Sequence, residues 1–204
     1  MALSFKAKKR LIIGVFSSVA AVWSGATAAV PVVGPLLADT AGLTVLTTAM
    51  AYSLSILYNK QVGIASLAAF ASVAIGAVLG QLALKVGASI IPIFGSYYNA
   101  TVTFILHAAT GWGLCEIFDS GKDLDDIRVS KMKEAIKRNK RKAELEKERF
   151  DSAMEQLPYS DREEVKRLMK QMNNRDLTEY QQTELMNKII AIFERNGASS
   201  PFED

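Results

Sequence analysis

Long apolar segments alternate with short breaks over the first part of the chain. The apolar segments cover residues 11–30, 36–58, 62–91 and 97–118. Each is long enough to cross a hydrocarbon core of about 30 Å as a helix. Their abundance of Ala and Leu favours helix over strand. The pattern predicts an all-α protein that begins with four apolar helices.

Two of the breaks share the pattern Pro-x-x-Gly, at residues 31–34 and 92–95. Proline ends or begins a helix because it lacks an N–H, and glycine allows the positive φ of a tight reversal. The break between them, residues 58–61, reads YNKQ and is polar. A shift of 61 residues aligns the two Pro-x-x-Gly motifs, so we expect two repeated helical hairpins. The residues expected to form the hairpin turns are Pro31, Gly34, Pro35, Pro92 and Gly95.

Charged residues are scarce in this part of the chain. Between residues 11 and 118 the Asp, Glu, Lys and Arg residues are Asp39, Lys60, Lys85 and Glu116. Basic residues at 6–10 and in the 58–61 link mark one end of the predicted hairpins, and the positive-inside rule places that end in the cytoplasm. The sequence therefore predicts four helices in a membrane, expected to be the bacterial inner membrane, with both termini cytoplasmic. The alternative is an apolar bundle buried at the centre of a larger soluble assembly.

A few residues of the apolar part merit individual interpretation. The candidate polar groups in the membrane are Asp39, Lys85, His107 and Glu116. Asp39 near a helix start and Lys85 near a helix end complement the helix dipole, and the alternative is that they pair or line a pore. His107 is interpreted as a buried or helix-facing histidine. Gly76 and Gly80 form a G-x-x-x-G motif that is expected to let helices pack closely.

The start of the chain also fits a secretory signal peptide. It has a basic start, an apolar run and an A-x-A site at Ala26–Ala28. The apolar run, however, continues to Pro31 without a polar mature start. This continuity favours an uncleaved helix.

The composition changes after residue 118, where the chain becomes densely charged and helix-forming. Its apolar residues recur every seven positions, which suits a short coiled coil or packing on a partner. A basic run comprises Lys137, Arg138, Lys140, Arg141 and Lys142. This run can contact anionic lipid headgroups or a partner, and the alternative is a solvated helix face. It has no interleaved aromatic residues, so nucleic-acid binding is not expected.

A small helical module is predicted after Pro158. Ser160–Glu163 and Thr178–Gln181 fit capping boxes that open two helices. Gly197 ends the second helix, and the residues after it are expected to fray.

Apolar residues along the charged part define a predicted interaction stripe. Its members are Ile136, Phe150, Leu157, Ile189 and Phe193. The stripe is expected to dock on a partner or on the chain itself. The predicted domains are a membrane-embedded double hairpin at 1–118, a charged helix or coiled coil at 119–158, and the small module at 159–204.

The sequence lacks the residues of common catalytic sites. It has one cysteine and one histidine, and no P-loop, Rossmann, zinc-protease or nucleophile-elbow motif. Cys115 and His107 are about two helical turns apart, too far to act as a pair. We therefore predict a non-enzyme without a cofactor or metal.

Residues 29–118 resemble the YcjF-type family of bacterial membrane proteins. The resemblance rests on the turn at 31–34 with Asp39 after it, and on ILYNKQVG at 56–63, IIPIFGSYYNA at 90–100 and AATGWGLCEIF at 108–118. Proteins of this family are often encoded beside, or fused to, GTPases. The resemblance implies a helical-hairpin membrane module that works with a GTPase or another cytosolic partner and has no catalytic residues.

Two functions follow as hypotheses. The first is a membrane anchor or scaffold that recruits a cytosolic protein, such as a GTPase, through its helical tail. The alternative is a pore-forming toxin or effector whose hairpins insert and oligomerise. The expected partners are a lipid bilayer, a cytosolic protein and further copies of the chain.

Overall fold

Helices account for the regular structure of the protein. The computed structural model describes residues 2–27, 35–86, 92–122, 124–174, 176–198 and 200–203, without the side chains of 24–41, 77–99 and 200. These ranges contain nine α-helices, one short 3₁₀ helix and no strand, which confirms the predicted all-α class. The expected turn residues Pro31 and Gly34 lie outside the described residues.

The apolar part forms four helices. They are α1 (Phe5–Thr27), α2 (Pro35–Leu57), α3 (Ile64–Val86) and α4 (Pro92–Asp119). Pro35 and Pro92 each stand at the first helical position, where the missing N–H of proline has no partner to lose. Gly95 therefore lies in the first turn of α4 and not in a hairpin turn, which corrects our expectation.

Local hydrogen bonds explain where two of these helices begin and end. The Ser4 hydroxyl accepts a hydrogen bond from the N–H of Ala7 at 3.1 Å. This cap starts α1 earlier than predicted and takes the basic start of the chain into the helix. After α2, Asn59 has a φ of 52° and the N–H of Lys60 donates to the carbonyl of Ser55 at 2.8 Å. The link between α2 and α3 thus turns where the polar break predicted it.

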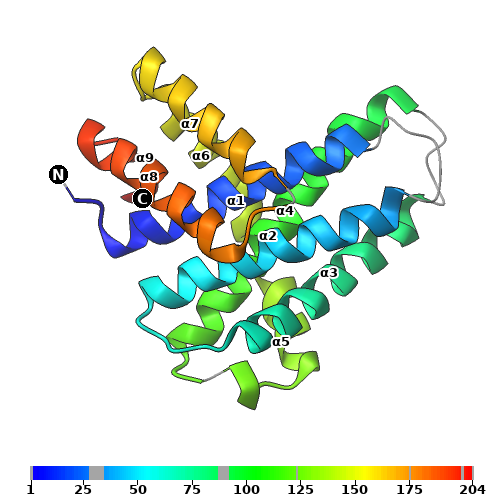
Figure 1. Cartoon of the computed structure of the whole chain (residues 1–204). Helices are drawn as coiled ribbons and strands as arrows, with labels where there is room; N and C mark the ends of the chain where they lie inside the picture. Colours follow the sequence, from blue (N-terminus) through cyan, green and yellow to red (C-terminus); the bar gives the residue numbers. More distant parts are fainter. Residues whose placement is uncertain are drawn as a thin grey trace.

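Helices α1–α4 form a bundle in which α1 packs most closely against α4, and α2 against α3 (Figure 1). Two contacts set the register of α1 on α4. The Ser17 hydroxyl lies 3.2 Å from Nδ1 of His107, and one turn away Gly111 lies against Ile13 and Met50. Ile13 precedes Ser17, whereas Gly111 follows His107, so α1 and α4 run antiparallel.

Helix α2 contacts both α1 and α4 near these residues. The Thr47 hydroxyl lies 3.1 Å from Nε2 of His107. Further along the bundle the indole of Trp23 covers Gly42, where an added Cβ would stand 2.2 Å from the ring. Only glycine fits at this crossing without moving the tryptophan.

The charged part folds back onto the bundle. After the 3₁₀ helix η1 (Leu124–Asp126) it forms α5 (Val129–Arg138), α6 (Lys140–Glu155), α7 (Tyr159–Met172), α8 (Glu179–Asn196) and α9 (Ser200–Glu203). We call α5–α9 the collar. Helix α5 packs on α3 and α4, α6 on α4 and α1, and α8 on α2 (Figure 1). The charged part is therefore joined to the bundle and does not extend from it as a separate coiled coil.

The helix ends in the collar follow the predictions only in part. A break at Asn139 divides the single charged helix that was expected. Helix α7 begins after Pro158, and no side chain caps it, so the predicted capping box at Ser160 is wrong. Thr178 and Gln181 form the predicted reciprocal box.

The end of the chain is ordered against the bundle. Gly197 ends α8 with a φ of 61°, as predicted. The following α9 buries Phe202 completely, with its ring 6.0 Å from that of Phe193. The expectation that these residues fray is thus corrected, because Phe202 completes the apolar core.

The described residues contain fewer candidate membrane spans than the sequence predicted. One helical stretch, Ala100–Asp119, is long and apolar enough to cross a membrane, and 78% of it is buried inside the protein. Gly42–Leu57 and Ile64–Gly76 are apolar but shorter. Within these ranges the structure thus offers one candidate span in place of four.

Candidate functional site

The collar is fastened to one end of the bundle, which we call the base. On α1, Phe150 of α6 covers Gly14, where an added Cβ would lie 2.6 Å from the ring. Arg10 donates to the carbonyl of Phe202 at 3.0 Å, close to the start of the same helix. Both contacts hold the collar to the N-terminal half of α1.

The other helices are held at the same end. On α4, Gly113 lets α5 approach so closely that an added Cβ would be 3.0 Å from the backbone nitrogen of Ile136. On α2, the hydroxyls of Ser53 and Thr183 are 3.0 Å apart. The collar thus contacts the ends of α2 and α4 that lie beside the start of α1.

The bundle continues well beyond these contacts. At about 1.5 Å per residue, α1 runs about 20 Å past Gly14, α2 about 27 Å past Ser53 and α4 about 32 Å past Gly113. In Figure 1 these free ends all point away from α7, α8 and α9. Asp39 and Lys85 are the charged residues of the sequence in this region. The free ends are therefore long, poor in charge and directed to one side.

One apolar side chain on the free end of α1 is well exposed. Val22 is 61% exposed, whereas its neighbour Trp23 is 6% exposed and packs inward on Gly42. Val22 therefore offers a position on the free end of α1 at which contact with lipid can be tested.

A polar layer joins three helices within the free ends, close to the collar. His107 is buried between Ser17 and Thr47. The Thr47 hydroxyl donates to the carbonyl of Leu43 at 2.7 Å, so it can accept from Nε2–H of the imidazole. Nδ1 then accepts from Ser17. The layer satisfies the buried histidine and fixes the mutual register of α1, α2 and α4.

Cations and aromatic rings meet at the base. Nζ of Lys9 donates to the Tyr58 hydroxyl at 3.0 Å and lies 5.3 to 5.5 Å from the ring centres of Phe5, Tyr58 and Trp112. Nζ of Lys142 lies 3.4 Å from the centre of the Trp112 ring. Burial and the nearby Lys9 charge lower the pKa of Lys142, and burial raises the pKa of Tyr58. The cluster couples α6 to α1, α2 and α4.

A buried carboxylate lies beside this cluster. Glu146 is 0% exposed, and among the described residues neither carboxylate oxygen has a hydrogen-bond partner. Burial raises the pKa of Glu146, and the charges of Arg10, Arg149 and Lys142 and the nearby Trp112 side chain oppose the shift. Keeping Glu146 ionised in this place costs stability.

We expect Glu146→Gln to stabilise the folded chain by about 1–2 kcal/mol near pH 8, with a smaller gain near pH 5. The pKa of Glu146 is raised in the folded chain, so the wild type loses relative stability as the pH rises through that folded value. Urea unfolding at both pH values measures the difference. A gain in stability that is the same at both pH values, or larger near pH 5, would contradict a raised pKa for Glu146.

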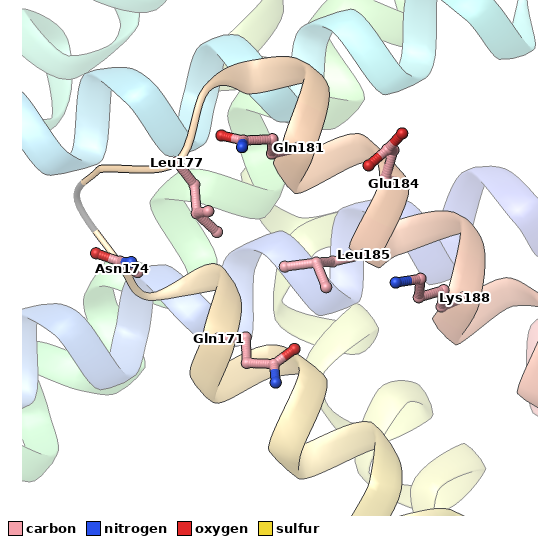
Figure 2. A pocket seen from close by; sticks show the side chains of 7 residues that line it. All are labelled: Gln171, Asn174, Leu177, Gln181, Glu184, Leu185 and Lys188. Carbon is pink, nitrogen blue, oxygen red and sulfur yellow. The ribbon is translucent and has the colours of Figure 1, made fainter.

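An open groove of about 290 Å³ lies between α7 and α8 (Figure 2). It is lined by Gln171, Asn174, Leu177, Gln181, Glu184, Leu185 and Lys188. Two leucines lie among amide and charged side chains, a mixture that suits a polypeptide surface better than a small apolar ligand.

The basic run divides into two groups. Arg138 donates from Nε to Glu116 at 3.2 Å, and Lys142 lies over Trp112. Lys137 and Arg141 are exposed and Lys140 is partly exposed. The first group thus binds the collar to the bundle and the second faces solvent.

The predicted interaction stripe is buried inside the chain. Ile136, Phe150, Leu157, Ile189 and Phe193 are each at most 5% exposed. Of the two docking alternatives that the sequence left open, the structure shows docking on the chain itself.

The predicted membrane-facing residues fall in different places. Asp39, Lys85 and Gly80 lie on helices whose side chains are not described at those positions. Glu116 accepts from Arg138 and Asn139 at the seam between α4 and the collar. Gly76 is exposed, and a Cβ added there would meet nothing within 4 Å.

Sequence reasoning missed several residues of the base. Glu146 lies on the apolar stripe of α6, between Ala143 and Phe150, and a carboxylate at that spacing was an available signal. The close contacts at Gly14 and Gly113 could not be found from local sequence. The residues that pack on these glycines, Phe150 and Ile136, are over 20 residues away along the chain. Within the described ranges, no group of three His, Cys, Asp or Glu residues is placed to hold a metal ion.

The fold and these contacts define a helical bundle with a collar on one end. Comparison of the chain with protein-family models, curated proteins and solved structures finds no match in any of the three.

Proposed function

We propose that the chain is a membrane anchor whose free helix ends enter a bilayer from one face, while the collar remains in water and presents a surface to a protein partner. The observation that supports this is the attachment of the collar at Gly14, Ser53 and Gly113, which leaves about 20 to 32 Å of charge-poor helix beyond it. That length is close to the hydrocarbon thickness of about 30 Å. Four helices that enter together satisfy their backbone groups internally.

The partner would meet the outer face of the collar, because the apolar stripe is already buried. The groove between α7 and α8 and the exposed rings of Tyr159 and Tyr180 offer such a surface. Tyrosine is enriched at protein interfaces. The family resemblance suggests a GTPase as the partner class.

Vesicle flotation with the full chain tests the anchor. The purified chain is mixed with neutral vesicles that contain a fluorescent dye, floated and then washed with carbonate. We expect the chain to stay with the vesicles and the dye to stay inside. A monomer that remains soluble without detergent and does not float would contradict the anchor. Dye release that rises with the amount of bound chain would support the pore alternative instead.

A further inference from the structure

Four cations follow one another along α5 and the first residues of α6, three of them exposed and Lys140 partly exposed. We call this cluster the joint patch, and its members are Lys133, Lys137, Lys140 and Arg141. Within the described ranges, none of the four forms an ion pair, whereas Lys131 pairs with Glu134 at 3.0 Å and Arg138 with Glu116. The joint patch therefore holds positive charge that the fold does not neutralise.

The start of α6 adds to this positive potential. Its N-cap, Asn139, makes no capping hydrogen bond, and its Nδ2 donates to Glu116 and to the carbonyl of Ala135. The first turn of α6 also contains no acidic residue. Basic side chains at the positive end of a helix dipole gain when an anion joins them.

The joint also lies at an informative height on the bundle. Ile136 of α5 rests on Gly113, about 32 Å from the beginning of α4. A hydrocarbon core is about 30 Å thick. When the free end of α4 lies in a bilayer, the joint is therefore close to the phosphate groups of the lipids.

We propose that the joint patch binds the phosphate groups of anionic lipids and so selects the membrane surface on which the chain inserts. This inference rests on the proposed membrane anchor and names its lipid class. Unpaired cations beside a membrane-inserted segment attract anionic headgroups over about 10 Å, the screening length at moderate salt.

Lipid is favoured over nucleic acid as the occupant. Single-stranded nucleic acid is bound through exposed aromatic rings that stack on bases. The ring of Trp112, which lies under Lys142 of the basic run, is 2% exposed. The joint patch thus offers charge without a stacking surface.

The test compares partition into neutral phosphatidylcholine vesicles with partition into vesicles that contain about 30% phosphatidylglycerol. The patch variant carries K133Q, K137Q, K140Q and R141Q in the full chain. The matched control carries K147Q, K166Q, R167Q and K170Q, which remove the same charge from α6 and α7. A fluorescent oligonucleotide is titrated against all three proteins.

We expect the wild type to prefer the anionic vesicles by about 20-fold or more at low salt, and the patch variant by less than about 3-fold. The control should keep at least half of the preference, and neutral-vesicle binding should be equal in all three.

A wild type that binds neutral and anionic vesicles equally would overturn the joint patch and leave the anchor standing. A wild type that binds neither would remove the anchor and the joint patch together. An unchanged preference in the patch variant, or oligonucleotide binding that only the patch variant loses, would also overturn the lipid assignment.

Discussion

Val22→Asp is expected to lower the partition of the chain into neutral vesicles by about 100-fold. Val22 is 61% exposed on the part of α1 that lies beyond the collar. An aspartate placed near the middle of a membrane helix costs about 2.5–3.5 kcal/mol. Flotation over a range of lipid concentrations measures the change.

Ile56→Asp is the matched control, because Ile56 is 54% exposed but lies at the base end of α2. Its partition should change by less than about 3-fold. Equal losses for the two variants would show that the free ends are not the part of the chain that enters lipid. Circular dichroism must show both variants folded.

Phe150→Ala is expected to reduce the free energy of unfolding by about 3–5 kcal/mol, the cost of emptying a large aromatic site in a core. Phe150 is 3% exposed, and its ring packs on Gly14 where α6 meets α1. Urea unfolding followed by circular dichroism measures the loss. Limited proteolysis should then cut the collar before the bundle.

Leu145→Ala supplies the comparison on the same helix, since Leu145 is 49% exposed. We expect it to cost less than about 1 kcal/mol. If Phe150→Ala lowers the free energy of unfolding as little as Leu145→Ala does, the contact between Phe150 and Gly14 does not hold the collar on the bundle.

The helices of the bundle could be predicted because their signals are local. Apolar runs between Pro-x-x-Gly breaks gave the helical class and the polar link after α2. The first residue of each helix was harder to predict. Pro92 begins α4, so Gly95 lies inside the helix. A Pro-Gly pair looks the same in a turn and in a first helical turn.

The position of the collar could not be predicted, because an apolar stripe on a helix does not determine which surface it packs against. Ile136 and Phe150 fit a coiled coil, a partner or the chain's own bundle equally well. The residues on which these two side chains pack are Gly113 and Gly14. Both lie inside apolar runs, where small residues are common. Hydrophobicity also predicted four spans because it measures composition, which does not tell that the candidate span Ala100–Asp119 is 78% buried inside the protein.

The most direct test of the anchor is the environment of Val22 beside that of Ile56. Single cysteines at these positions, in a Cys115→Ser background, are labelled with an environment-sensitive nitrobenzoxadiazole dye and mixed with neutral vesicles. If the free helix ends are inserted, position 22 should show a blue shift and quenching by lipid-attached spin labels, and position 56 should show neither. Equal, water-like emission at both positions would contradict insertion of the free helix ends.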